Sequence, residues 1–112
     1  IKSKDVTYTQ EGKKLTIILD TAMNQNAVDL AKDSDLLICE STYAENESEQ
    51  AREYKHLTTT EAATIAKKAK AKKLALVHIS EKHGHRHIQL LKEAKKVFKN
   101  TIIPDDLNIL KV

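Results

Sequence analysis

The chain has 112 residues and a formal net charge of +3; 40% of its residues are hydrophobic but only 4% are aromatic. This length suits about one domain, and its core must be built from aliphatic side chains. Charged residues make up 31% of the chain, and no stretch approaches the ~18 apolar residues of a membrane-spanning helix. The single cysteine, Cys39, excludes an internal disulfide framework. We therefore predict a soluble, cytoplasmic protein without a membrane partner.

Strand-like and helix-like runs alternate along the chain, which predicts an α/β layered architecture in a single domain over residues 1–112. An acidic segment over 44–54 is either a loop or a loosely held helix. The other predicted elements are, in chain order, strands over 5–9 and 15–20, a helix over 25–32, a strand over 35–40, a helix over 58–72, a strand over 74–79, a helix over 86–99, and short strands over 101–103 and 107–110.

The helix over 58–72 has the clearest local signals. Thr58 and Glu61 form a T-x-x-E capping box, which satisfies two backbone donors at the start of a helix. Small apolar residues then recur at helical spacing, namely Ala62, Ile65, Ala66 and Ala69. This alanine-rich face lets the helix approach a sheet closely.

Polar side chains stand at the ends of three predicted strands. Asp20, Glu40 and His78 occupy these positions, and His56 lies just before the capped helix. Ligands gather at the carboxyl ends of strands in open α/β sheets, so together these residues are candidates for metal binding or proton transfer. Each also has an ordinary structural interpretation: a helix cap for Asp20, a solvated strand end for Glu40, a helix flank for His56 and a satisfied core residue for His78.

Two further groups of residues each have two possible roles. His83, His85 and His87 alternate around Gly84 and either bind zinc or nickel or form a loop leading into a helix. Lysines crowd the ends of both long helices, where they complement the helix dipole or form a phosphate-binding face. They are Lys67, Lys68, Lys70, Lys72 and Lys73 on one helix and Lys92, Lys95, Lys96 and Lys99 on the other. Apart from Phe98, which lies on the apolar stripe of its helix, no aromatic residue is interleaved with them, which favours the dipole interpretation.

Five segments of the sequence together resemble a known protein family. They are 15–21 (Leu-Thr-Ile-Ile-Leu-Asp-Thr), 35–43 (Asp-Leu-Leu-Ile-Cys-Glu-Ser-Thr-Tyr), 51–66 with its His-Leu-Thr sequence, 74–80 (Leu-Ala-Leu-Val-His-Ile-Ser) and the closing segment 93–107. In this order and spacing they resemble the C-terminal half of ribonuclease Z, the metallo-β-lactamase-fold endonuclease that trims the 3′ end of precursor tRNA. The resemblance extends from about residue 13 to residue 112.

The resemblance implies a fold, a set of site residues and a reaction. The fold is the C-terminal half of a metallo-β-lactamase αββα sandwich. The implied site residues are Asp20 and His78 for metal binding, His56 and Glu40 for catalysis, and Thr58 and Ser80 for substrate binding. Asp20 would bridge two zinc ions and His78 would bind one of them. His56 would donate a proton to the leaving oxygen, and Glu40 would pair with His56.

The implied cofactor is zinc, the implied substrate is precursor tRNA, and the implied assembly is a homodimer. A two-metal site activates water as a nucleophile and stabilises charge on a phosphodiester. A histidine held by a glutamate suits general acid catalysis. Lysine contacts to phosphates would be independent of sequence, as expected for recognition of tRNA shape.

The chain also departs from the family pattern. Leu19 replaces a glycine, Cys39 replaces a histidine, and the sequence from Ser80 to His83 replaces Ser-x-Arg-Tyr. The H-x-H-x-D-H motif that supplies most zinc ligands is absent, whereas a catalytic zinc ion needs about three protein ligands. We therefore expect the chain alone to be inactive and to require a missing N-terminal half, or a partner chain with that motif. Its start at Ile1 suggests a processed or truncated product.

Two other functions remain in competition. The chain is alternatively a non-catalytic α/β domain that pairs with another chain, or with its own copy, through an exposed apolar surface. A third hypothesis is a related metallo-β-lactamase-type hydrolase that acts on a small ester.

Overall fold

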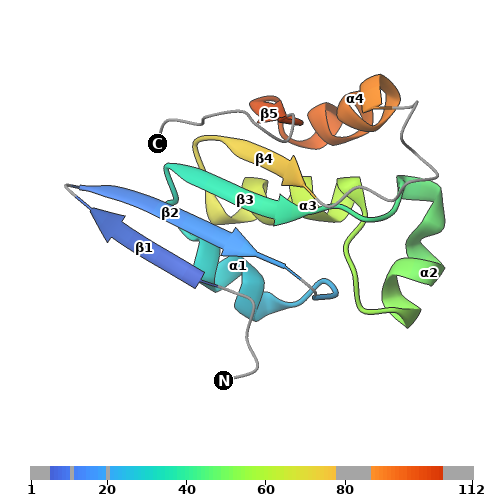
Figure 1. The fold of residues 1–112 in the computed structure, drawn as a ribbon, viewed down its shortest axis with the longest axis horizontal. Helices are drawn as coiled ribbons and strands as arrows, with labels where there is room; N and C mark the ends of the chain where they lie inside the picture. Colours follow the sequence, from blue (N-terminus) through green and yellow to red (C-terminus); the bar gives the residue numbers. More distant parts are fainter. Residues whose placement is uncertain (1–5, 11, 20, 78–86, 105–112) are drawn as a thin grey trace.

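The computed structural model describes residues 6–10, 12–19, 21–77 and 87–104. Within these ranges, the side chains of residues 6–10, 45 and 87 are not described. The fold consists of one sheet with a layer of helices packed on it (Figure 1).

The sheet has five strands in the order β1-β2-β3-β4-β5. Strand β1 pairs antiparallel with β2, and every later pair is parallel. The strands are β1 (Val6–Gln10), β2 (Lys13–Ile18), β3 (Leu36–Glu40), β4 (Leu74–Val77) and β5 (Thr101–Ile102). Because β2 to β5 run in one direction, their carboxyl ends meet at one edge of the sheet, as the arrowheads in Figure 1 show.

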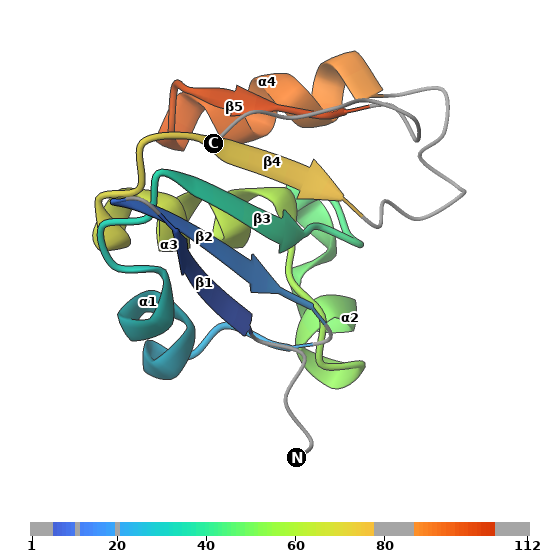
Figure 2. The ribbon, with the colours of Figure 1, turned by 60° about the vertical axis from the view of Figure 1, so that its left-hand side comes forward.

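Helices α1, α3 and α4 cover one face of the sheet, with α3 in the middle of the layer (Figures 1 and 2). A short 3-10 turn, η1, and helix α2 lie instead at the edge where the parallel strands end. The helical segments are α1 (Gln25–Ala31), η1 (Glu45–Glu47), α2 (Ser48–Glu53), α3 (Thr59–Ala69) and α4 (His87–Val97). The acidic segment over 44–54 is therefore largely helical.

The core between the sheet and the helices is aliphatic, as the composition predicts. Strand residues alternate between the two faces of a sheet, so Leu37 and Cys39 point toward the helices while Ile38 points away. The helices contribute mainly alanines to this core. The fully buried members from β2, β4 and α3 include Ile18, Leu74, Leu76, Ala62, Ala63, Ile65 and Ala66.

Helix α3 begins as predicted but ends three residues early. Thr58 accepts a hydrogen bond from the backbone N–H of Glu61 at 3.1 Å, and Glu61 accepts one from the N–H of Thr58 at 3.0 Å. Lys70 then adopts a left-handed conformation with φ of 59°, and the N–H of Ala71 bonds back to the carbonyl of Ala66. This bond is a common way to close the last turn of a helix, and the helical spacing alone does not reveal it.

The predicted α/β fold class is confirmed, and every predicted strand and helix within the described ranges is present, with its ends shifted by at most three residues. The predicted strand over 107–110 lies outside the described residues. Among the helices that the structure describes, none is long and apolar enough to cross a membrane.

Candidate active site

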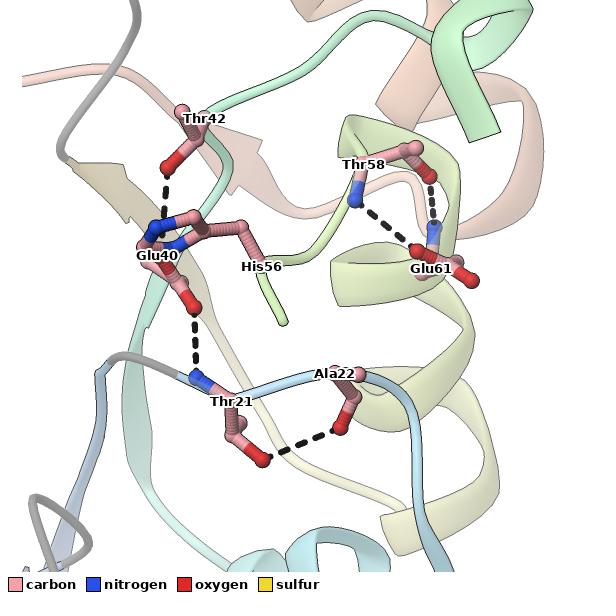
Figure 3. A network of polar contacts seen from close by, with 7 residues as sticks. All are labelled: Thr21, Ala22, Glu40, Thr42, His56, Thr58 and Glu61. Carbon is pink, nitrogen blue, oxygen red and sulfur yellow. Dashed lines mark hydrogen bonds and ion pairs between the residues drawn. The ribbon is translucent and has the colours of Figure 1, made fainter. Parts of the chain in front are cut away.

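Glu40 and His56 meet at the carboxyl edge of the sheet. Glu40 is the last residue of β3, and His56 lies in the segment between α2 and α3. The Nδ1 atom of His56 is 2.7 Å from the Oε2 atom of Glu40 although the two residues are 16 positions apart in the chain (Figure 3). The position agrees with the prediction that polar groups gather where parallel strands end.

Backbone hydrogen bonds bring these two segments together. Tyr43 forms an isolated parallel bridge with Thr58. The N–H of Tyr43 donates to the carbonyl of Leu57 at 3.3 Å, and the N–H of Thr59 donates to the carbonyl of Tyr43 at 3.0 Å. Leu57 is fully buried and anchors the segment in the core. His56 is thus held against the end of β3 by the residues that follow it.

The Glu40 carboxylate contacts Thr21, Thr42 and His56. Its Oε1 atom accepts from the backbone N–H of Thr21 at 2.8 Å, and its Oε2 atom accepts from the hydroxyl of Thr42 at 3.1 Å and contacts His56 (Figure 3). The Glu40 side chain has no exposed surface. A buried carboxylate needs such partners because leaving its oxygens without hydrogen bonds is strongly unfavourable. A carboxylate suits this position because both of its oxygens accept hydrogen bonds and neither needs an acceptor.

His56 is the accessible member of the pair. Its side chain keeps 24% of its surface exposed, against none for Glu40. The Tyr43 ring lies beside it, with ring centroids 6.2 Å apart and planes tilted by 52°. Since Glu40 binds Nδ1, the other ring nitrogen lies on the opposite side of the imidazole. This geometry suits a histidine that exchanges a proton with a ligand while a carboxylate fixes its ring.

Asp20, His78 and Ser80 lie outside the described residues, so their predicted roles stay predictions. Their described neighbours in the chain are close to Glu40. Thr21 donates its N–H to Glu40, and the carbonyl of Val77 accepts from the N–H of Ser41 at 2.9 Å. The residues next to Asp20 and His78 in sequence are thus held at the same edge of the sheet as the Glu40–His56 pair.

Thr58 has a structural role in the helix layer. It is 2% exposed, and its hydroxyl accepts from the N–H of Glu61 at the start of α3. The structure therefore explains Thr58 as a helix cap, and its predicted contact with substrate is not tested.

The residues in the described ranges do not make a metal site. Within these ranges there is no group of three or more His, Cys, Asp or Glu side chains that could hold a metal ion. The predicted ligands Asp20 and His78, and the side chains of His83, His85 and His87, lie outside what the structure describes. The metal ligands therefore stay a prediction from the sequence.

Sequence reasoning missed two partners of Glu40. Thr42 is two positions from Glu40, and residues i and i+2 share a face of an extended strand, so its hydroxyl could have been expected there. Thr21 contributes a backbone N–H, which no residue type signals. The hydroxyl of Ser41 is buried and has no hydrogen-bond partner among the residues that the structure describes.

The chain matches no protein-family model. In sequence it is 42% identical to ribonuclease Z of Protochlamydia amoebophila over 104 residues, which are 92% of this chain and 33% of that protein. The chain thus spans about a third of the length of this curated relative, and similar relatives from Bacillus cereus give the same proportion.

Two solved structures have a similar fold. The metallo-β-lactamase fold protein YhfI from Bacillus subtilis superposes with a TM-score of 0.82 and 27% identity, over 90% of this chain and 41% of YhfI. The short form of human tRNase Z gives a TM-score of 0.73 and 26% identity, over 94% of this chain and 35% of the human chain. The resemblance to ribonuclease Z is therefore confirmed: the chain is similar to this family over nine tenths of its length and has an α/β fold of the metallo-β-lactamase type.

Proposed function

We propose that the chain is part of a zinc-dependent endoribonuclease that removes 3′ trailers from precursor tRNA. The observation that carries the proposal is the Glu40–His56 contact of 2.7 Å at the carboxyl edge of the sheet. This contact joins the two segments in which the resemblance to ribonuclease Z puts the catalytic residues. The similarity to curated proteins named ribonuclease Z supports the same substrate.

In this proposal His56 is the general acid. When water attacks the phosphorus and the P–O bond breaks, His56 transfers a proton to the leaving oxygen. Glu40 orients the imidazole through Nδ1 and balances the positive charge of the protonated ring. The oxygen therefore leaves as a hydroxyl group. Proton transfer of this kind contributes on the order of 10²–10⁴-fold to turnover.

Zinc is the cofactor in this proposal, with Asp20 and His78 as ligands from this chain. Two protein ligands are fewer than the roughly three of a catalytic zinc ion, so the remaining ligands would come from an H-x-H-x-D-H segment elsewhere in the protein or on a partner chain. When bound, the metal ions would supply an activated water molecule. The chain without that segment would be inactive.

The uncovered face of the sheet supports a proposal about the larger fold to which the chain belongs. Leu15, Ile17, Ile38 and Val77 are half-buried on the face of the sheet that α1, α3 and α4 leave uncovered. We propose that residues 1–112 form one domain, half of an αββα sandwich, whose second sheet covers this face. A homodimer in the cytoplasm remains part of the proposal.

Substitution of His56 tests the general-acid role in the full-length protein. We expect His56→Ala to lower the turnover of a precursor tRNA about 10²–10⁴-fold while the affinity for the RNA stays within about twofold. Single-turnover cleavage assays and binding titrations measure the two quantities. Thermal unfolding of the variant serves as the control, because removal of the imidazole leaves Glu40 with one donor fewer. Cleavage at the rate of the unsubstituted protein would exclude this role.

A second candidate function has its own support. The TM-score with YhfI, 0.82, is higher than the score with human tRNase Z, 0.73, and YhfI is described by its fold alone. A hydrolase of the same fold that acts on a small ester would use the same Glu40–His56 pair. Hydrolysis of a small phosphodiester such as bis(p-nitrophenyl) phosphate, without cleavage of precursor tRNA, would favour this second function.

A further inference from the structure

We propose that the exposed end of α2 and the turn after it, with Arg52, Tyr54 and Lys55, form a subsite for a single-stranded nucleotide next to the cleaved phosphodiester. Tyr54 would stack on the base, and the two cations would contact the neighbouring phosphates. The inference rests on the proposed function and goes beyond it, because it names residues outside the Glu40–His56 pair.

The exposed ring of Tyr54 is the feature that first suggests this subsite. Its side chain is 61% exposed, and among the described residues it is one of two large hydrophobic side chains left open to solvent, the other being Ile88. Tyr54 precedes His56 by two positions, so their Cα atoms are at most about 7.6 Å apart. An exposed aromatic ring at this distance from a candidate general acid can stack on a base beside the reacting phosphate.

The turn that carries Tyr54 is fixed by the backbone. The N–H of Tyr54 donates to the carbonyl of Gln50 at 2.9 Å, and the N–H of His56 donates to the carbonyl of Ala51 at 2.8 Å. Between them, Lys55 adopts a left-handed conformation with φ of 59°. The turn therefore directs His56 back toward Glu40 and leaves the preceding residues at the surface, in a fixed relation to the candidate active site.

Lys55 is unexpected in this conformation. Glycine is the residue usually found in a left-handed position after a helix, because a side chain is strained there. Lys55 is exposed, and neither it nor Arg52 forms an ion pair with any residue that the structure describes. The Lys55 ammonium group is therefore exposed beside an aromatic ring, where it can contact a phosphate.

The charges around Tyr54 are mixed in sign, so base stacking would contribute more to binding than net charge. Glu49 and Glu53 on α2 are also exposed, so the surface is mixed in charge and would not attract a polyanion through net charge alone. A base on Tyr54 would bring its flanking phosphates within reach of Arg52 and Lys55. The occupant to which this surface commits is therefore RNA with unpaired bases.

The test uses the full-length protein and a precursor tRNA with a single-stranded 3′ trailer. We expect Tyr54→Leu to raise KM about tenfold, the equivalent of losing one base stack, with kcat changed by less than about twofold. Tyr54→Phe retains the aromatic face and should keep the original KM. If the hydroxyl group of Tyr54 carried the effect instead, both variants would raise KM to a similar degree, and this result would exclude base stacking.

Substitution of Lys70, at the opposite edge of the sheet, is a matched control for substitution of Lys55. Lys70 is also exposed, follows a helix and has the same φ of 59°, but it lies after α3, where the parallel strands begin. Both Lys55→Gly and Lys70→Gly should keep or raise the melting temperature. Only Lys55→Gly should weaken RNA binding and reduce the slope of log K against log salt concentration by about 0.7, the value for one phosphate contact on a single strand.

The outcomes separate the two proposals. Unchanged KM and salt dependence in Tyr54→Leu and Lys55→Gly, with normal cleavage by the unsubstituted protein, would exclude the subsite and leave the proposed function standing. The same holds if Tyr54→Leu alters only the oligomeric state, since the ring would then belong to a protein interface. Absence of both cleavage and RNA binding by the unsubstituted full-length protein would overturn the proposed function and the subsite together.

Discussion

At the scale of single residues, the geometry of the site depends on which groups contact each oxygen of Glu40. One oxygen accepts from the Thr21 backbone, and the other accepts from Thr42 and contacts His56. The carboxylate thus connects the segment after β2 with the segment before α3. Any change at Glu40 should disturb both segments, whereas a change at Thr42 removes one hydrogen bond.

Replacing the carboxylate of Glu40 by an amide tests whether it connects these two segments. In Glu40→Gln the amide offers one acceptor oxygen to donors that lie on both sides of the original carboxylate, so its NH₂ group must face the Thr21 N–H or the Nδ1 side of His56. We expect a loss of about 1–3 kcal/mol in the free energy of unfolding, the range for a buried polar group without its partner. Urea unfolding measures the loss, and cleavage of precursor tRNA should slow in parallel.

Thr42→Val is the matched control, since it removes the hydroxyl and keeps the shape of the side chain. It should cost about 1 kcal/mol, as for one ordinary hydrogen bond, and leave most of the activity. If Glu40→Gln were no more damaging than Thr42→Val, the connecting role of Glu40 would be wrong.

The sequence allowed the residue types of the site to be predicted better than its contacts. Glu40 and His56 stand out because a charged group and an imidazole border apolar, buried segments. The hydrogen bond from Thr21 comes from the backbone, so residue type carries no signal for it. The distance between Glu40 and His56 depends on the bridge between Tyr43 and Thr58, which forms only when the chain folds.

At the scale of elements, the edge opposite the candidate site is held together by Asp35. Its carboxylate accepts from the backbone N–H of Lys14 at 2.7 Å and pairs with the Lys72 ammonium at 3.0 Å. These contacts join the start of β2, the start of β3 and the loop between α3 and β4. The hydrogen bond from Lys14, and then the one from Lys72, hold the pKa of Asp35 below its ordinary value of 3.8.

The lowered pKa of Asp35 predicts a pH-dependent contribution to stability. Since the pKa is lower in the folded than in the unfolded chain, the carboxylate stabilises the fold above about pH 4. This stabilisation declines as the pH falls through 3.8 toward the folded pKa. Asp35→Asn should therefore lower the melting temperature at pH 7, and the difference from the unsubstituted protein should shrink below pH 3.8. A difference that is constant from pH 7 to pH 3 would contradict this explanation.

The elements themselves were predictable where local signals were strong. The capping box of Thr58 and Glu61 marks the start of α3 correctly because the signal lies within one helical turn. The end of α3 was predicted at residue 72, whereas the helix ends at Ala69. Lysines are good helix formers, so neither Lys70 nor Lys72 signals the left-handed turn that tertiary packing imposes.

At the scale of the whole molecule, the candidate catalytic pair and the Asp35 contacts lie at opposite edges of one sheet. Glu40 and His56 meet at the carboxyl end of β3, close to α2 in Figure 2, while the Asp35 contacts lie at the amino ends of β2 and β3. The helices cover one face. The sequence could not reveal what covers the other, because half-buried aliphatic residues such as Ile38 suit an interface with any apolar partner.

A map of the cleavage site on precursor tRNA incubated with the full-length protein would decide whether this protein processes tRNA. We predict one cut at the junction between the tRNA and its 3′ trailer, and we expect this cut to be lost in His56→Ala. An intact precursor, together with hydrolysis of a small ester that needs His56, would contradict the assignment to tRNA processing. It would instead place the Glu40–His56 pair in a different hydrolase of the same fold.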